Sequence, residues 1–414
     1  LKITMANNND NKVLNVPPLR FPEFSGEWKM CTIGELTTKV GSGVTPRGGE
    51  AVYKTEGHPF VRSQNVGLGN LLLDDIAFID EETHLRQKST ELQFNDVLLN
   101  ITGASIGRSA LVDKQIVGGN VNQHVCIIRT KENLVPSFIC SFLLSNYGQR
   151  QIDSFQAGGN RQGLNFEQIK SIKITIPSKD EQIKIAKLLR AIDERIATQN
   201  KIIEKLQSLI KGLNDHILKN IEGDQVCFAD LGEAYGGLSG KSGDDFGCGD
   251  PFITYMNVYQ NTYISENDYE LVQIAPDEKQ NSVQYGDALF TLSSETPEEV
   301  GMGAVYLGKS QKLYLNSFCF GVHFHGNRVL PQYIAHFISS TSFRKAIYPL
   351  AQGSTRFNLQ KQDFMRMKFV LPSLEEQKRI ATALDALYNH LANEKLLTEQ
   401  YLLLKQYLLQ QMFI

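Results

Sequence analysis

The 414-residue sequence has little of several features that would each place it in a particular class of protein. Its six cysteines, at positions 31, 126, 140, 227, 248 and 319, form no CxxC pair, which favours free thiols in a reducing compartment over a disulfide framework. No apolar run is long enough to cross a bilayer. The polar, asparagine-rich residues 1–12 have no apolar stretch like that of a secretory signal. We therefore expect a cytoplasmic protein with no membrane partner.

Strong net charge is also missing. The 42 Lys and Arg residues and 45 Asp and Glu residues give a formal net charge of −3 at pH 7. A generic binder of polyanions would be strongly basic. Any affinity for nucleic acid must therefore come from local basic clusters, or from a partner that supplies many of the phosphate contacts.

Motifs for catalysis are equally scarce. No glycine turn after a strand is present to hold S-adenosylmethionine, and no Ser/His/Asp or paired-carboxylate arrangement stands out. His323 and His325 would share one face of a strand, but no third ligand with metal-type spacing is evident. We expect a chain that is not an enzyme by itself and that holds no cofactor and no metal.

What the sequence does contain is a long internal repeat. The segment Pro177–Gln182 returns as Pro372–Gln377, and the match continues upstream at the same offset, pairing Arg161 with Arg356. Two copies of so long a unit are not a solenoid. They predict a pseudo-two-fold symmetric molecule with two similar binding surfaces.

A long amphipathic helix is predicted after each copy of this segment. Ser178 and Glu181 have the spacing of a capping box, as do their counterparts in the second copy. Apolar residues then follow at alternating spacings of three and four, from Ile185 to Ile217 and, less regularly, from Ile380 to Leu408. Two matched helices in one chain predict an antiparallel intramolecular coiled coil.

Each long helix follows a stretch rich in short β-type runs and in glycine and asparagine turns. Each stretch also carries one predicted helix, Pro136–Tyr147 or Pro331–Phe343. The predicted fold class is therefore α+β, with two tandem α+β domains separated by two long helices. The predicted division is a polar N-terminal tail at 1–20, a first domain at 21–177, a first long helix at 178–220, a second domain at 221–372 and a second long helix at 373–414.

Polar loops of both domains carry side chains that suit DNA. Arg, Asn and Gln can bond base edges, whereas Ser, Thr and backbone amides suit phosphates. The candidates in the first domain are Arg47, Arg62, Gln64, Asn65, Arg108, Asn122, Gln123 and Arg161. Those in the second are Lys241, Ser242, Tyr255, Asn257, Asn316, Ser317 and Arg356. The equivalent Arg161 and Arg356 are expected on phosphates, and the loops that differ are expected on bases, although any one loop alone could be an ordinary polar surface.

This arrangement resembles the specificity subunits of type I restriction–modification systems. The resemblance rests on Val16–Phe24 with Glu27-Trp28, on the Gly-Ser-Gly-Val-Thr-Pro loop at 41–46, and on the pattern Pro-x-x-x-Glu-Gln-x-x-Ile-Ala at 177–186 and 372–381. It covers essentially the whole chain. The second domain departs from it, because Gly236–Gly240 stands in place of a Thr-Pro loop.

The resemblance implies two target-recognition domains, each reading one half of a bipartite, interrupted target in double-stranded DNA. It implies that the helical rod sets the spacer and docks two modification (methyltransferase) subunits, and that restriction (translocase and endonuclease) subunits are further partners. S-adenosylmethionine, ATP and Mg would belong to those partners. The alternative is a non-enzymatic coiled-coil scaffold that presents two protein-binding modules. A self-contained methyltransferase or nuclease is disfavoured by the missing cofactor and metal motifs.

Overall fold

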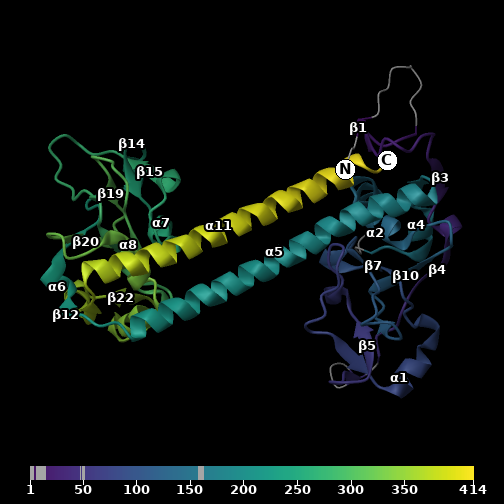
Figure 1. Ribbon diagram of the computed structural model, residues 1–414, viewed down its shortest axis with the longest axis horizontal. Helices are drawn as coiled ribbons and strands as arrows, with labels where there is room; N and C mark the ends of the chain where they lie inside the picture. Colours follow the sequence, from purple (N-terminus) through teal and green to yellow (C-terminus); the bar gives the residue numbers. More distant parts are fainter. Residues whose placement is uncertain (1–3, 6–14, 47, 49–51, 157–162) are drawn as a thin grey trace. The chain divides into compact units, whose positions relative to one another are not determined.

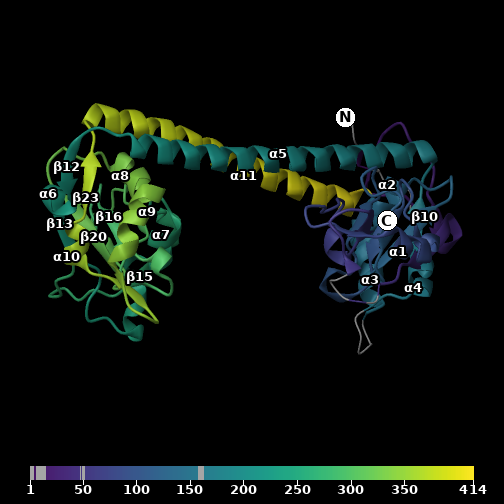
Figure 2. The same ribbon diagram turned by 90° about the horizontal axis from the view of Figure 1, so that it is seen from below.

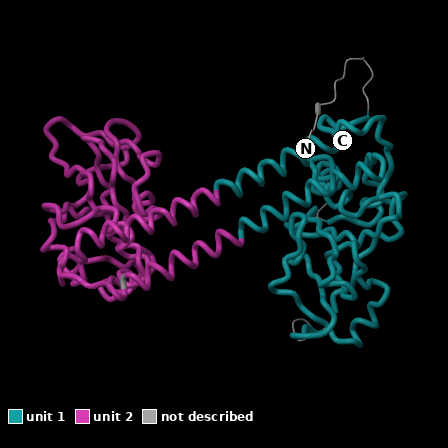
Figure 3. The backbone as a smooth tube through the Cα atoms, in the orientation of Figure 1, with its two compact units in different colours: residues 1–200, 396–414 teal, residues 201–395 magenta. Residues whose placement is uncertain are grey.

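The computed structural model describes residues 4–5, 15–46, 48, 52–156 and 163–414 (Figure 1). The chain divides into two compact units (Figure 3). Unit 1 comprises residues 1–200 with 396–414, and unit 2 comprises residues 201–395. Each unit therefore combines one globular α+β domain with parts of both long helices, which confirms the predicted fold class.

Unit 1 is built on a four-stranded antiparallel sheet in the order β4-β10-β7-β8. Its strands are β4 (Thr37–Ser42), β10 (Val125–Thr130), β7 (Val97–Asn100) and β8 (Ser109–Leu111). A smaller sheet, β6-β5-β9, has the strands β6 (Ala77–Ile79), β5 (His58–Val61) and β9 (Asn120–Val121). Alternate residues of β7 and β10 pack on opposite faces, one toward the helices and the other toward the smaller sheet, so these strands are apolar on both faces at 97–99 and 125–128.

The remaining elements of unit 1 close the core and connect it to the long helices. The short strands are β1 (Thr4–Met5), β2 (Leu19–Arg20), β3 (Lys29–Thr32) and β11 (Lys173–Ile176). The helices are α1 (Glu81–Arg86), α2 (Pro136–Leu144), α3 (Asn146–Ser154), α4 (Phe166–Ser171) and α5 (Lys179–Lys219), the last of which continues into unit 2.

Unit 2 repeats this topology in the orders β13-β20-β16-β18 and β15-β14-β19. The strands of these sheets are β13 (Gly232–Gly236), β20 (Cys319–Phe324), β16 (Ala288–Thr291), β18 (Gly303–Val305), β15 (Tyr269–Val272), β14 (Phe246–Ile253) and β19 (Tyr314–Leu315). The other strands are β12 (Asp224–Cys227), β17 (Ser293–Ser294), β21 (Ala351–Gln352), β22 (Phe357–Leu359) and β23 (Lys368–Leu371). The helices are α6 (Phe228–Leu231), α7 (Tyr255–Gln260), α8 (Pro331–Ile338), α9 (Thr341–Ile347), α10 (Lys361–Met365) and α11 (Leu374–Gln411), with α8 and α9 beside the larger sheet (Figure 2).

The single helix predicted after the central strands of each domain is in fact two helices, separated at Ser145 and Ser340. The backbone at both serines is extended, and each hydroxyl bonds the carbonyl three residues earlier at 2.6 Å. The same hydroxyl accepts the amide of Gly148 or Phe343 and so caps the next helix. The apolar pattern continues across the break, which is why it predicts one helix.

Both long helices begin with the same hydrogen-bond network around a buried glutamine. The Gln182 Oε1 accepts the amide of Val135 at 2.8 Å, and its Nε2 donates to the carbonyls of Asn133 and Pro177 at 3.1 Å. Gln377 makes the same three bonds, 195 residues further along, at 2.8 to 2.9 Å. The repeated glutamine therefore fixes the start of each long helix to the loop before α2 or α8.

The predicted capping boxes are only half formed. The Ser178 Oγ accepts the amide of Glu181 at 3.4 Å, as expected for a helix cap. The carboxylate of Glu181, however, is buried and accepts two bonds from Arg20, at 2.7 and 2.8 Å, instead of bonding the backbone. Glu376 likewise accepts from Arg379. In both helices an arginine thus takes the place of the backbone amide that the glutamate would bond in a complete capping box.

The long helices pack as an antiparallel pair in each unit. In unit 1, Asp193 pairs with Lys405 at 2.6 Å, and two residues later Arg195 donates to the Tyr401 hydroxyl at 3.3 Å, so the numbers rise on one helix as they fall on the other. In unit 2 the helices share an apolar cluster of Leu206, Ile210 and Leu391. Ile192 and Leu408 of the predicted heptad seam are buried in one core cluster of unit 1, so the seam is used for intramolecular packing in both units.

Candidate DNA interface

Three loops of unit 1 meet at one end of the strands of its larger sheet. The strand pairing places Ser42 opposite Cys126 and Asn100 opposite Val125. The end of β4, the end of β7 and the start of β10 therefore lie together, which brings together the loops at 43–46, 101–108 and 122–124. Of the residues predicted to contact DNA, Arg108, Asn122 and Gln123 lie in these loops. Arg62, Gln64 and Asn65 flank Ser63, whose carbonyl accepts a bond from Asn100 at the end of β7.

Two polar side chains, the buried Asn100 and the half-buried His124, tie these loops together. The Asn100 amide donates to the Ser63 carbonyl at 2.8 Å and to the Ser105 hydroxyl at 3.1 Å. The His124 Nδ1 bonds the Thr102 hydroxyl at 2.6 Å. Neither residue is among those predicted from the sequence. Their only signal is a polar residue at the end of an apolar run, where a strand meets the loop.

Three predicted contact residues converge on Asp75, through its backbone carbonyl and its carboxylate. Arg62 donates to the Asp75 carbonyl at 2.8 Å, and its guanidinium lies 5.4 Å from the centre of the Tyr53 ring. The Asn65 amide donates to Asp75 Oδ1 at 2.9 Å, and the Gln64 amide bonds Oδ2. Arg62 is therefore held in place by its own chain. No pattern in the sequence distinguishes Asp75 from other surface aspartates.

Two asparagines predicted to contact DNA instead have the same structural role in both units. Each is part of the shared frame, meaning the sheets and the buried hydrogen bonds that recur in the two units. Asn65 is fully buried, and its Nδ2 donates to the Leu72 carbonyl at 2.9 Å. Asn257 is also buried and makes the same kind of bond to the Ser265 carbonyl at 2.8 Å. A buried amide whose hydrogen bonds are satisfied has no edge free for a base. We correct their assignment to structural residues.

A second asparagine pair shapes the turn before the central strand. The Asn122 Oδ1 accepts the amide of His124 at 3.0 Å, and the Asn316 Oδ1 accepts that of Phe318 at 2.9 Å. Asn122 is buried and Asn316 half-buried. We assign both to the turn. The next residue in each unit, Gln123 or Ser317, is exposed.

The first contact loop takes the same path in both units, although their sequences differ. A side chain at Gly43 would collide with the carbonyl of Val121, and one at Gly237 would collide with that of Asn316. Only glycine allows so close an approach of two backbones. Gly236–Gly240 therefore occupies the place of the Thr-Pro loop.

Lys241 and Ser242, predicted contacts in this loop of unit 2, are engaged within the chain. The Lys241 Nζ lies 2.5 Å from a Glu278 carboxylate oxygen, and its side chain is only 8% exposed. Hydrogen bonds from Gln280 and from Lys241 lower the pKa of Glu278 to about 2, so the pair is ionised. The Ser242 hydroxyl bonds Asp245 at 3.0 Å and caps a short helix. Both side chains are therefore already hydrogen-bonded within unit 2.

The remaining predicted residues are placed as follows. Arg108 and Gln123 of unit 1, and Ser317 and Arg356 of unit 2, are exposed, and Tyr255 is half-buried. Arg47 and Arg161 lie outside the described residues.

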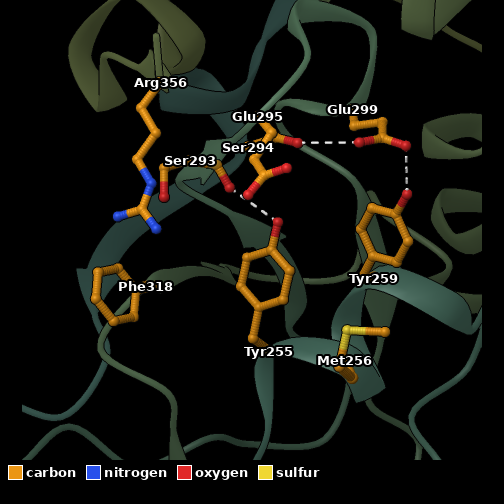
Figure 4. A pocket seen from close by; sticks show the side chains of 9 residues that line it. All are labelled: Tyr255, Met256, Tyr259, Ser293, Ser294, Glu295, Glu299, Phe318 and Arg356. Carbon is orange, nitrogen blue, oxygen red and sulfur yellow. Dashed lines mark hydrogen bonds between the residues drawn. The ribbon is translucent and has the colours of Figure 1, made fainter.

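The loops of unit 2 surround a pocket of about 360 Å³ (Figure 4). Its lining residues are Tyr255, Met256, Tyr259, Ser293, Ser294, Glu295, Glu299, Phe318 and Arg356. The Tyr255 hydroxyl donates to the Ser293 carbonyl at 2.8 Å, and the Tyr259 hydroxyl donates to Glu299 at 2.7 Å. The bond from Tyr259 is the main reason that the pKa of Glu299 is lowered, which keeps this carboxylate ionised.

In both units, the loop that follows the buried asparagine (Asn65 or Asn257) is hydrogen-bonded to the long helices. In unit 1, the Lys405 Nζ donates to the Leu68 carbonyl at 3.0 Å while paired with Asp193. In unit 2, the Tyr263 hydroxyl donates to Asp385 at 2.6 Å. The candidate interface is therefore positioned by the helices as well as by the sheet.

The described residues include no group of three or more His, Cys, Asp or Glu side chains that could hold a metal ion. None of their helices is long and apolar enough to span a membrane. His323, considered above as a metal ligand, bonds Asp287 through its Nδ1 at 2.8 Å.

The model of the type I restriction modification DNA specificity domain matches residues 25–208 and 241–400. The chain belongs to this family. It is 23% identical over 397 residues to the type I restriction enzyme EcoKI specificity subunit of Escherichia coli (strain K12), covering 87% of this chain and 82% of that protein. It is 21% identical over 394 residues to the putative MjaX specificity subunit of Methanocaldococcus jannaschii, covering 88% of each.

The fold is shared with a solved member of such a system. The structure of the type I restriction–modification S subunit from M. genitalium superposes with a TM-score of 0.56 at 14% identity, covering 96% of this chain and 99% of that chain. The resemblance inferred from the sequence motifs is thereby confirmed.

Proposed function

We propose that this chain is the sequence-specific DNA-binding specificity subunit of a type I restriction–modification complex, in which each unit reads one half of a bipartite, interrupted DNA target. One observation carries the proposal. Both units bring the same loops to the same end of the same sheet, but the exposed side chains at equivalent positions differ, with Gln64 and Gln123 in unit 1 and Met256 and Ser317 in unit 2. A shared frame with different exposed groups suits two readers of different sequences.

In unit 1 we propose base contacts from the exposed Gln64 and Gln123, and from Arg62 as held by Asp75. Arg108 is exposed and suits either a base or a phosphate. Arg47 and Arg161 remain proposed contacts on the strength of the sequence. In unit 2 we propose contacts from Tyr255, Ser317 and Arg356.

We propose that the chain itself is not catalytic and acts in the cytoplasm. Its partners would be two modification subunits that carry S-adenosylmethionine, together with restriction subunits that use ATP and Mg. Such partners would supply the phosphate contacts that a chain of net charge −3 lacks.

Helix α11 has a surface suited to such a partner. Its exposed apolar residues are Leu396, Leu402, Leu403, Leu404 and Tyr407, of which Leu403 is 65% exposed. Three consecutive exposed leucines are costly to solubility unless another protein covers them. We propose that a modification subunit docks here.

The test is methylation sequencing of a host that expresses this chain with the modification subunit of the same genome. The proposal predicts one methylated motif made of two specific halves separated by a spacer of fixed length. Methylation at a continuous motif, or none that depends on this chain, would contradict it. The alternative scaffold function predicts partner binding without DNA, whereas DNA binding by the proposed complex should weaken as salt rises.

A further inference from the structure

The pocket of unit 2 has two chemically different sides. Figure 4 shows Arg356 beside Phe318 at one side, and Glu295 and Glu299 at the other. The ring of Tyr255 lies between these two sides, and Met256, which is 49% exposed, lies next to Tyr259. Such a pocket offers hydrogen-bond donors at one side and acceptors at the other.

The two carboxylates differ in what they can still bind. Glu299 accepts the Tyr259 hydroxyl at 2.7 Å and the Ser294 hydroxyl at 3.1 Å, so each of its oxygens is engaged within the unit. Glu295 is exposed and makes no hydrogen bond or ion pair with another described residue. Glu299 thus holds the loop between β17 and the short helix at 297–299, while Glu295 is the acceptor left for a ligand.

A carboxylate without a partner in the protein can accept hydrogen bonds from only a few groups of DNA. Phosphates repel it, and the O6 and N7 atoms of purines and the O4 atom of thymine are acceptors like itself. The donors on the major-groove edge are the exocyclic amino groups, N4 of cytosine and N6 of adenine. The rings of Tyr255 and Phe318 and the side chain of Met256 would exclude water around such a bond and so strengthen it.

We propose that Glu295 is a specificity-determining residue that accepts a hydrogen bond from the exocyclic amino group of one base in the half-site read by unit 2. Arg356, on the opposite side of the pocket, holds the neighbouring phosphate and offsets the charge of Glu295. This inference rests on the proposed function and names the chemical group that the pocket recognises.

The experiment compares Glu295→Ala, Glu295→Gln and the matched control Glu298→Gln in the full complex. Glu298 is exposed on the same loop but does not line the pocket. Its substitution therefore removes the same charge without removing a group from the pocket. Methylation sequencing and binding to DNA with each base of the target changed in turn give the preference at every position. Thermal unfolding of each variant checks that it folds.

The expected result is a loss of discrimination by about tenfold to a hundredfold at one position of the second half-site in Glu295→Ala, with the first half-site unchanged. Glu295→Gln separates the two bases, because a carboxamide pairs well with adenine. It retains the preference if the amino group is that of adenine, and it admits adenine in place of cytosine if the group is that of cytosine.

Other outcomes overturn the inference. If Glu295→Ala and Glu298→Gln both raise affinity for all DNA with base preferences intact, Glu295 acts only through its charge. Changes in the first half-site would also contradict a local contact. A wild-type complex with no bipartite motif would instead refute the proposed function itself.

Discussion

The two units bury an aspartate at the same point of their larger sheets but compensate its charge differently. In unit 1, Asp96 forms a bidentate ion pair with Arg129 at 2.7 Å. In unit 2, Asp287 accepts a hydrogen bond from the Tyr235 hydroxyl at 2.6 Å and bonds His323 at 2.8 Å. Burial raises the pKa of Asp287 despite these bonds. The same frame thus tolerates a permanent ion pair in one unit and a titratable network in the other.

The largest difference should appear on removing the two charges. Asp96→Asn leaves Arg129 without its partner and should destabilise unit 1 by about 3 kcal/mol. Asp287→Asn retains an acceptor for Tyr235 and should cost only about 1 kcal/mol. Urea unfolding followed by hydrogen exchange in each unit measures both. Equal costs would mean that the two networks are energetically equivalent.

The pH dependence of the Asp287 variant sharpens this comparison. Because the folded-state pKa of Asp287 is raised, its contribution to stability is present below the unfolded-state pKa and is lost as pH rises through the folded-state value. Asp287→Asn should therefore become less destabilising as pH rises from about 4. Unfolding free energies measured across this range check the sign, and a cost that grows with pH would contradict it.

Removing the shared glutamines should have a smaller effect, and it should be equal in the two units. Gln182→Ala and Gln377→Ala each leave one amide and two carbonyls without their side-chain partner, at a cost of about 2 kcal/mol. Unfolding of each unit by hydrogen exchange gives the two values. A difference of more than about 1 kcal/mol would show that the frame is not equivalent in the two copies.

The smallest expected effect concerns acid sensitivity. Burial lowers the pKa of His336, against the opposing effect of Asp385, which lies 2.7 Å from its Nε2. The unfolded state therefore binds the proton more readily, so this contribution to stability is present above about pH 6.5 and is lost as pH falls. Ser141 occupies the corresponding place in unit 1. Unit 2 should lose exchange protection first on acidification, and His336→Asn should reduce that loss; an unchanged pH dependence would refute this.

Local periodicity explains how much of the fold could be predicted. The heptad seam, the serine caps and the strand runs are encoded by neighbouring residues, and the structure has helices or strands at each of them. The break at Ser145 could not be seen, because the apolar pattern runs through it and only the tertiary position of α3 requires it.

The residues of the candidate site were harder to predict from the sequence than the fold. Hydrogen bonds and ion pairs between different loops decide which side chains remain available to DNA. Asp75 lies more than ten residues from Arg62, and Glu278 lies 37 residues from Lys241, so no local pattern reveals that both cations are held by carboxylates. Asn65 corresponds to Asn257, a spacing of 192 rather than 195 residues, because the loops differ in length. Because of this shift, an asparagine with the same structural role in both units appeared in the sequence as a difference between the two DNA-binding loops.

Methylation sequencing of the Arg62→Ala complex tests the central claim most directly. Arg62 lies in unit 1 and is held by Asp75 at the end of the sheet where the three loops meet. If each unit reads one half-site, this change relaxes specificity in a single half of the motif, by about 1 to 3 kcal/mol at the affected position, and leaves the other half and the spacer unchanged. Altered specificity in both halves, or in neither, would contradict the account.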